Sequence, residues 1–119
     1  MITVADLQGH WRRDWITAPG FEDRTTRVHW LQAGALFADI RVPLARPDMT
    51  CASCLADLSD SALAQVMAAE GFAGDITVVD NACTWRRAIN WHGVPQSDDI
   101  GLMSWDADGA LIEEGVHAR

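Results

Sequence analysis

The stretch GHWRRDW, residues 9–15, lies close to the N-terminus and decides the fold that the sequence predicts. In this stretch Trp11, Arg13 and Trp15 alternate with His10, Arg12 and Asp14. On a strand, successive side chains point to opposite faces. The two indoles and Arg13 would then share one face, and such a face needs a large apolar surface opposite it. We therefore predict a strand over residues 10–16 whose tryptophans face a core or a cavity.

A second stretch, WRRAINW at residues 85–91, has the same pattern late in the chain. On a strand over residues 83–91, Trp85, Arg87, Ile89 and Trp91 would share one face. The common pattern is too short to establish an internal repeat, so we interpret the two stretches as similar strands of one sheet.

Further alternating segments, separated by turn residues, complete a mainly β chain. Asp80-Asn81 and Asp108-Gly109 are typical of tight turns between neighbouring antiparallel strands. Strands joined by hairpins form a meander, which removes its exposed edges by closing into a barrel. We predict one domain over residues 1–119, an antiparallel β-barrel of about seven strands: residues 10–16, 27–32, 36–42, 72–79, 83–91, 99–105 and 110–117.

One α-helix is expected between the third and the fourth of these strands. Ser59 is a suitable N-cap residue, and Leu63, Val66 and Met67 form a narrow apolar stripe at helical spacing. Gly71 is placed to end the helix after about residue 70. We expect this helix to plug or flank one end of the sheet.

The composition excludes several classes of partner. The 119-residue chain carries a formal net charge of −8, which argues against binding nucleic acid or docking on an anionic membrane. No apolar run is long enough to span a membrane, and the first twenty residues lack the apolar region of a signal peptide. We therefore expect a cytoplasmic protein. Three cysteines do not indicate a disulfide framework.

Five short motifs follow one another along the chain: L-x-G-x-W-R-R (7–13), V-x-W-L-Q (28–32), D-I-R-V-P (39–43), F-A-G (72–74) and W-R-R (85–87). This ordered set is similar to the lipocalins and the wider calycin superfamily, and in particular to a group of small, uncharacterised, lipocalin-like bacterial proteins. The resemblance implies a calycin-like β-barrel in which Trp11 is buried as the residue that closes one end, with Gly9 letting the backbone pack closely beside it. It also implies that an arginine from a late strand, Arg86 or Arg87, packs across Trp11.

The arginines and tryptophans are the candidate site residues. In one interpretation, Arg13, Arg41 or Arg87 holds a carboxylate or a phosphate inside a cavity, while tryptophans line its apolar part. Asp39 shares a strand face with Arg41 and Phe37, so the two charges would form an internal ion pair if that face points inward. In the other interpretation, the indoles fill the barrel and the arginines pair with Asp14 or Asp39. The candidate lining residues are Trp11, Trp15, Trp30 and Trp91.

Cys51 and Cys54 form a C-x-x-C motif in a loop, several residues before the predicted helix. A redox motif should open a helix directly after a strand, and a zinc site needs two further ligands, for which the scattered Cys83 and histidines lack the spacing. We expect these thiols to bind no metal and to have no redox role. We expect no cofactor and assign no catalytic residue, since neighbouring acidic residues on a strand point to opposite faces.

Three functions follow in order of preference. The first is a non-catalytic protein that binds a small apolar or amphipathic ligand, with an anionic group or without one, in the barrel cavity. The second is a structural or protein-interaction domain with a solidly packed barrel, and the third is an enzyme acting through Arg, His and Asp in the cavity. An open pocket of about 300 Å³ or more would favour the first over the second.

The last predicted strand, residues 110–117, is the natural edge of the sheet. Six tryptophans provide more aromatic surface than one small barrel readily buries, and an exposed apolar patch commonly marks an interface. We therefore predict a homodimer made by packing sheet faces, with the barrel closed inside each chain.

Overall fold

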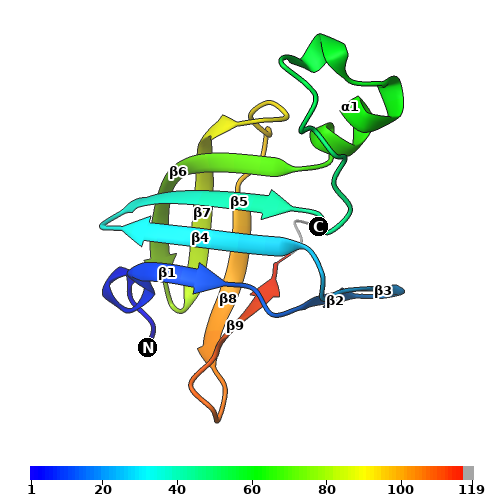
Figure 1. Cartoon of the computed structure of the whole chain (residues 1–119). Helices are drawn as coiled ribbons and strands as arrows, with labels where there is room; N and C mark the ends of the chain where they lie inside the picture. The colour runs from blue at the N-terminus through cyan, green and yellow to red at the C-terminus, as the bar shows by residue number, and fades with distance from the viewer. Residues whose placement is uncertain (117–119) are drawn as a thin grey trace.

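Residues 1–116, which the computed structural model describes, are mainly β with one α-helix and a seven-stranded antiparallel sheet that curls into a half-barrel (Figure 1). The strand order is β1-β4-β5-β6-β7-β8-β9, so each strand after β4 pairs with its successor, as predicted for a meander. The bounds are β1 Gly9–Arg12, β4 Arg27–Ala33, β5 Leu36–Val42, β6 Glu70–Val79, β7 Ala82–Asn90, β8 Asp99–Trp105 and β9 Leu111–Gly115.

Tight turns between the strands use the residues that the sequence indicated. Asp80 and Asn81 both have positive φ, 50° and 65°, and connect β6 to β7. The loop between β8 and β9 ends on Gly109, whose φ is 84°. Positive φ at both residues of the β6–β7 turn gives it a twist that matches the flanking strands, so β6 and β7 can pair as a hairpin.

The two edges of the half-barrel are β1 and β9, and no backbone pairing joins them within residues 1–116. Side chains cross this gap instead, since the rings of Trp11 and Trp105 lie 6.0 Å apart between their centroids. The predicted last strand extended to His117, which lies outside the described residues; β9 ends at Gly115.

The first predicted strand is wrong in its second half. β1 ends at Arg12, and the chain then forms a separate hairpin of β2, Ile16–Ala18, and β3, Phe21–Asp23. Pro19 and Gly20, whose φ is 74°, make the turn of this hairpin. Trp15 therefore leaves the face of Trp11 and is 45% exposed.

The predicted common face of residues 85–91 is also interrupted. A β-bulge shifts the register between Ala73 and Gly74, so Gly74 pairs with Arg87 and Ala73 pairs with Ile89. The extra residue in β7 reverses the alternation. Trp85 is buried, whereas Ile89 is 71% exposed and Trp91 is 56% exposed on the outside.

The helix α1, Asp60–Met67, lies between β5 and β6 in the chain and begins after Ser59, whose Oγ accepts a hydrogen bond from the Ala62 amide at 3.2 Å. It ends three residues before the predicted end, and Gly71 is not its terminator. The reason is tertiary, because Glu70 already pairs with Arg41 as the first residue of β6. Two short 3-10 helices complete the chain, η1 Val4–Leu7 and η2 Leu55–Asp57.

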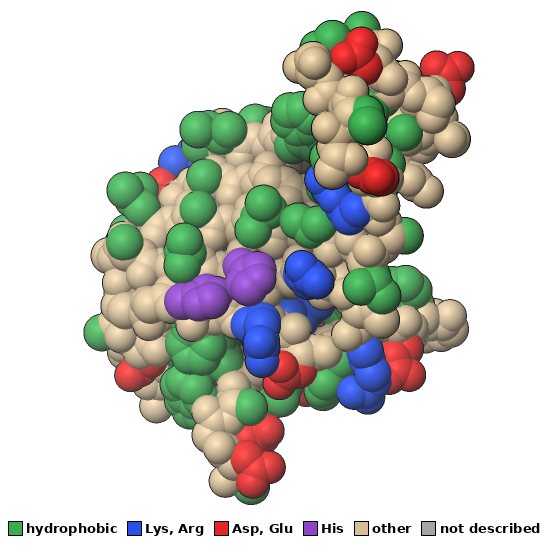
Figure 2. Space-filling model, viewed as in Figure 1, with side chains coloured by type: hydrophobic (Ala, Val, Ile, Leu, Met, Phe, Trp, Pro, Cys, Tyr) green, Lys and Arg blue, Asp and Glu red, His purple; other side chains and the backbone are tan. Residues whose placement is uncertain are grey.

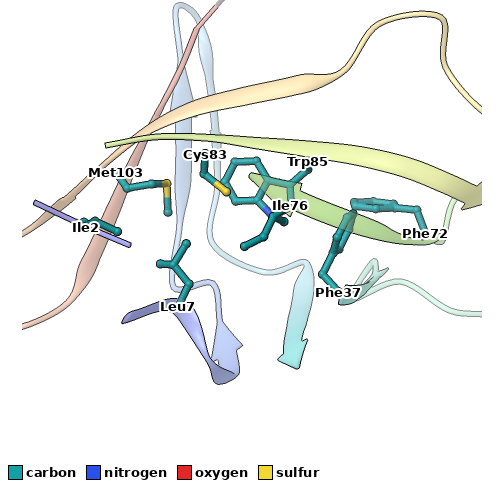
Figure 3. Close-up of a cluster of buried hydrophobic side chains, with 8 residues drawn as sticks. All are labelled: Ile2, Leu7, Phe37, Phe72, Ile76, Cys83, Trp85 and Met103. Carbon is teal, nitrogen blue, oxygen red and sulfur yellow. The ribbon is translucent and has the colours of Figure 1, made fainter. Parts of the chain in front are cut away.

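The core fills the middle of the half-barrel (Figure 3). Leu7 of η1 closes its lower side in that view, and both Leu7 and Cys83 are 0% exposed. A buried side chain of this kind stabilises the fold by about 1.5–3 kcal/mol relative to an exposed one. The buried apolar side chains of this cluster are Ile2, Leu7, Phe37, Phe72, Ile76, Cys83, Trp85 and Met103.

Trp11 lies at one end of this core but is half-buried rather than buried. Its indole Nε1 donates a hydrogen bond to the Leu7 carbonyl at 2.8 Å, and its ring stacks on Trp30 with centroids 5.7 Å apart. Gly9 does not serve a close approach, since nothing lies within 4 Å of where its Cβ would be. Its φ of 108° is the reason for glycine at this position.

Candidate functional site

The charged end of the half-barrel begins with the inner face of β5. Phe37 is buried, so Asp39 and Arg41 on the same face also point inward. Arg41 Nε donates to Asp39 Oδ1 at 3.2 Å, and the Asp39 side chain is only 10% exposed. The internal ion pair considered in the sequence analysis is therefore present.

Arg13 and Asp23 form a second ion pair, which ties the β2–β3 hairpin to this end. Arg13 Nη2 donates to Asp23 Oδ2 at 3.2 Å. Asp23 Oδ1 accepts hydrogen bonds from the backbone amides of Thr25 and Thr26 at 2.9 and 3.0 Å. Hydrogen bonds from Thr26, followed by those from Thr25, hold the pKa of Asp23 well below its usual range, so it stays ionised.

The two arginines lie close enough to repel each other. Burial lowers the pKa of Arg13, and the positive charge of Arg41 lowers it further, against the opposing effect of Asp23. Burial raises the pKa of Asp39, although Arg41 partly offsets this effect. The site therefore combines desolvated charges of both signs, a common property of ligand-binding sites.

Glu113 of β9 adds a carboxyl from the opposite edge of the sheet. Its side chain extends over Gly101 of β8, where a Cβ would lie 2.5 Å from Glu113 Cγ. The residue is exposed as a whole, yet burial of its carboxyl is the largest cause that raises its pKa to about 6, followed by the charge of Asp99. Arg13 and Arg41 act in the opposite direction.

A pocket of about 270 Å³ opens at this end, between the β2–β3 hairpin and the end of α1. Its walls combine both ion-paired arginines with apolar side chains from the hairpin and from the end of β5. Such a mixture suits a ligand with a charged group and an apolar body. The lining residues are Arg13, Ile16, Phe21, Asp23, Thr26, Arg41, Pro43, Ala68 and Glu70.

Arg87 lies deeper, against the core. Its guanidinium carbon is 3.7 Å from the centroid of Phe72, and Arg41 lies 5.1 Å from the same ring. Within residues 1–116, Arg87 Nε is buried without a hydrogen-bond partner. Arg86 instead points outward and binds Asp75, with Nε 2.9 Å from Oδ1. The expected packing of a late arginine across Trp11 is therefore replaced by packing of Arg87 on Phe72.

The tryptophans predicted to line a cavity divide into two groups. Trp11 and Trp30 belong to a stacked aromatic group with Trp85 and Trp105 that fills the other end of the half-barrel. Trp15 and Trp91 are exposed and line neither the core nor the pocket. Of the eight predicted site residues, the structure brings together Arg13, Asp39, Arg41 and Arg87 at the charged end.

Sequence analysis missed several residues of the charged end. Ile16, Phe21 and Asp23 reach it only through the β2–β3 hairpin, and Pro19-Gly20 between two short apolar segments was the signal that could have indicated it. Glu70 and Glu113 had no such signal, because their placement follows from the pairing of β6 with β5 and of β9 with β8.

Two other features are weaker candidates for a functional site. A groove of about 310 Å³ lies between the N-terminal segment and β8, lined among others by Asp6, Asn81 and Ser104, without converging charges. Cys51 and Cys54 are exposed free thiols. Within the described part of the chain, no three His, Cys, Asp or Glu side chains gather as a metal ion would require.

Comparison of the chain with protein-family models, curated proteins and solved structures finds no match. The resemblance to the lipocalins therefore stays a prediction from the motifs. Among residues 1–116, no helix is long and apolar enough to cross a membrane.

Proposed function

We propose that this protein binds a small amphipathic anion, non-catalytically, in the pocket at the charged end. The observation that carries the proposal is the pair of guanidinium groups, Arg13 and Arg41, that line a pocket with an apolar rim. Each of them uses one nitrogen in an ion pair, to Asp23 and to Asp39 respectively. A guanidinium has five N–H donors, so both keep donors for a ligand.

The chemistry of the pocket favours a carboxylate or phosphate head group. Arg41 binds Asp39 through Nε, which leaves its two terminal nitrogens able to hold a carboxylate. An anion between Arg13 and Arg41 would also offset their mutual repulsion. The apolar body of the ligand would contact Ile16, Phe21 and Pro43. Since the core fills the middle of the half-barrel, we place the ligand at its mouth.

The test compares three probes that share one alkyl chain and differ in the head group: octanoate, octanol and octylammonium. Isothermal titration calorimetry of the full chain at pH 7 should show binding of octanoate at least tenfold tighter than that of the other two. Arg41→Gln and Arg13→Gln should each weaken octanoate binding at least tenfold, because each removes a charge from the pocket.

Arg86→Gln is the matched control, since Arg86 is an arginine of the same sheet whose partner, Asp75, lies outside the pocket. It should leave octanoate binding unchanged. Equal affinity for the three probes, or unchanged binding in both pocket variants, would overturn the proposal.

A protein-interaction domain is the second candidate. It is supported by the interior, where eight buried apolar residues form one cluster, and by a pocket slightly smaller than the 300 Å³ that we set for a ligand-binding barrel. Our proposal also retains a lipocalin-like origin of the half-barrel, which rests on the motifs, and a cytoplasmic location.

A further inference from the structure

A lobe of residues 44–69 projects from the sheet between β5 and β6 (Figure 1). It contains η2 and α1, neither of which has a buried residue. Leu44, Leu55 and Met67 are 65%, 59% and 43% exposed. Leu63 and Val66 of the helix stripe are half-buried, so the apolar residues that a partner surface would cover are Leu44, Leu55 and Met67.

The outer face of β4 to β7 offers such a surface. The registers align Leu31, Ala38, Ala73 and Ile89 in one row across the four strands. Leu31 and Ile89 are 55% and 71% exposed, and Ile40 in the next row is 50% exposed. Ala38 and Ala73 lie between Leu31 and Ile89 in this row. Figure 2 looks onto the part of the face formed by β4 to β6 and shows apolar side chains spread over it.

The lobe and the face carry opposite charges. Arg12 and Arg27 are exposed on the side of the face formed by β1 and β4. In Figure 2 arginine and histidine side chains lie beside the apolar ones. The lobe carries three aspartates, at 48, 57 and 60, against the single Arg46. Complementary charge fixes orientation between surfaces that are otherwise apolar.

We propose that the lobe of one molecule packs on the outer face of a second copy, and that the second lobe packs reciprocally on the first. Each chain has one lobe and one face, so a two-fold dimer uses both surfaces of both chains and leaves none open for further growth. One side of a stable interface holds about 20–30 residues. The lobe contributes 26 residues, 44–69, and the facing strands contribute the partner side.

This arrangement differs from the packing of two sheet faces that the sequence analysis predicted. The outer face of a half-barrel is convex, so two such faces would touch only along a narrow strip. Face-to-face packing would also leave both lobes without a partner. A lobe can follow the curve of the sheet and bring its aspartates to Arg12 and Arg27.

Sedimentation equilibrium of the full chain tests the dimer. At tens of micromolar the mass should be twice 13.0 kDa. Ile40→Glu on the face and Met67→Glu on the lobe should each raise the dissociation constant at least tenfold; Leu55→Glu is the second lobe variant. Leu102→Glu is the matched control, because Leu102 is an exposed aliphatic residue of β8, 44% exposed, that pairs with Ala82 at the opposite end of β7 from Ile89. It should remain a dimer.

Mixing the two monomeric variants distinguishes the packing modes. The Ile40→Glu chain keeps an intact lobe and the Met67→Glu chain keeps an intact face, so the mixture should form a one-to-one heterodimer through one of the two contacts. Arg27→Asp should weaken the dimer, and Asp57→Arg combined with Asp60→Arg should restore it. A monomeric parent at high micromolar concentration would overturn the proposal. So would a dimer that survives both the face and the lobe variants, or a mixture of monomeric variants that forms no heterodimer.

Discussion

The two ends of the inner face of this half-barrel are built on the same strands but have opposite character. At one end, four tryptophans contact one another beside the buried core: Trp11 stacks on Trp30 and lies tilted against Trp105, and Trp85 meets Trp30 edge-on. At the other end, the same face carries two ion pairs and a pocket of about 270 Å³. β5 alone passes from buried Phe37 to Asp39 and Arg41 within five residues.

This difference separates stability from the binding that we propose. Burial of apolar side chains is the dominant favourable contribution to folding, and Trp85 and the core beside it therefore set stability. The charged end contributes little, since desolvation of its ions cancels much of their attraction. Charges kept at such a cost are better explained by a ligand than by folding. The comparison predicts that variants at the two ends affect different measurements.

Trp85→Ala should have the largest effect, because Trp85 is 6% exposed and packs edge-on to Trp30 with centroids 5.6 Å apart. We expect a loss of about 3–5 kcal/mol in the free energy of unfolding in urea. Trp11→Ala should cost roughly half as much, because Trp11 is half-buried. An equal loss from the double variant Asp39→Asn/Arg41→Gln, which removes the ion pair without leaving a buried charge, would break the separation of the two ends.

Gly74→Ala tests the β-bulge that places Arg87 inside and Ile89 outside. A Cβ at Gly74 would clash with the backbone carbonyl of Arg86, so the strands must shift. We expect a destabilisation of about 1–3 kcal/mol by urea unfolding. Gly115→Ala, where a Cβ would meet nothing within 4 Å, is the matched control and should be near neutral.

Glu113→Gln tests the charged end through pH. The pKa of Glu113 is about 6 in the folded protein, against 4.5 as the ordinary value. A raised carboxyl pKa contributes stability that is fully present below pH 4.5 and is lost as the pH rises through 6. The urea midpoint of the variant relative to the parent should therefore rise between pH 4.5 and 6 and then stay level. A pH-independent difference would show that Glu113 is not desolvated.

Gly101→Ala also tests whether the Glu113 carboxyl is desolvated, and its effect on stability should be smaller. The three atoms nearest to the new methyl group all belong to the Glu113 side chain, which is flexible and can move away. We expect the pKa of Glu113, followed by NMR of its side chain, to fall toward 4.5 as the carboxyl becomes more hydrated. An unchanged pKa would mean that the raised pKa of Glu113 has a cause other than its packing against Gly101.

Ser59→Ala should have the smallest effect on global stability. It removes the N-cap of α1, a change of about 1 kcal/mol that acts on local opening of the helix. Because α1 has no buried residue, the urea midpoint should hardly change, while hydrogen exchange of the α1 amides should become faster. A shift of the global midpoint as large as that of Trp85→Ala would place the lobe within the core structure.

Much of the fold was predictable from local signals. Alternating segments and turn residues such as Asp80-Asn81 predicted the meander, because hairpin pairing depends on neighbouring residues. The period of two along one strand placed Asp39 and Arg41 on the face of Phe37, and the burial of Phe37 shows that this face points inward. Ser59 marked the start of the helix, since capping is equally local.

Only the tertiary structure decided where that periodicity fails and which strands meet. The β-bulge near Gly74 moved Ile89 and Trp91 to the outer face, and the β2–β3 hairpin took Trp15 away from the core. Glu113 and Asp23 reached the charged end through pairing and folding of separate segments. The sequence by itself determined the order of the main strands and the turns between them, but not the β2–β3 hairpin or the inward face of the second half of β7. The site depends on contacts between residues far apart in the chain, and these are set by the register and curvature of the whole sheet.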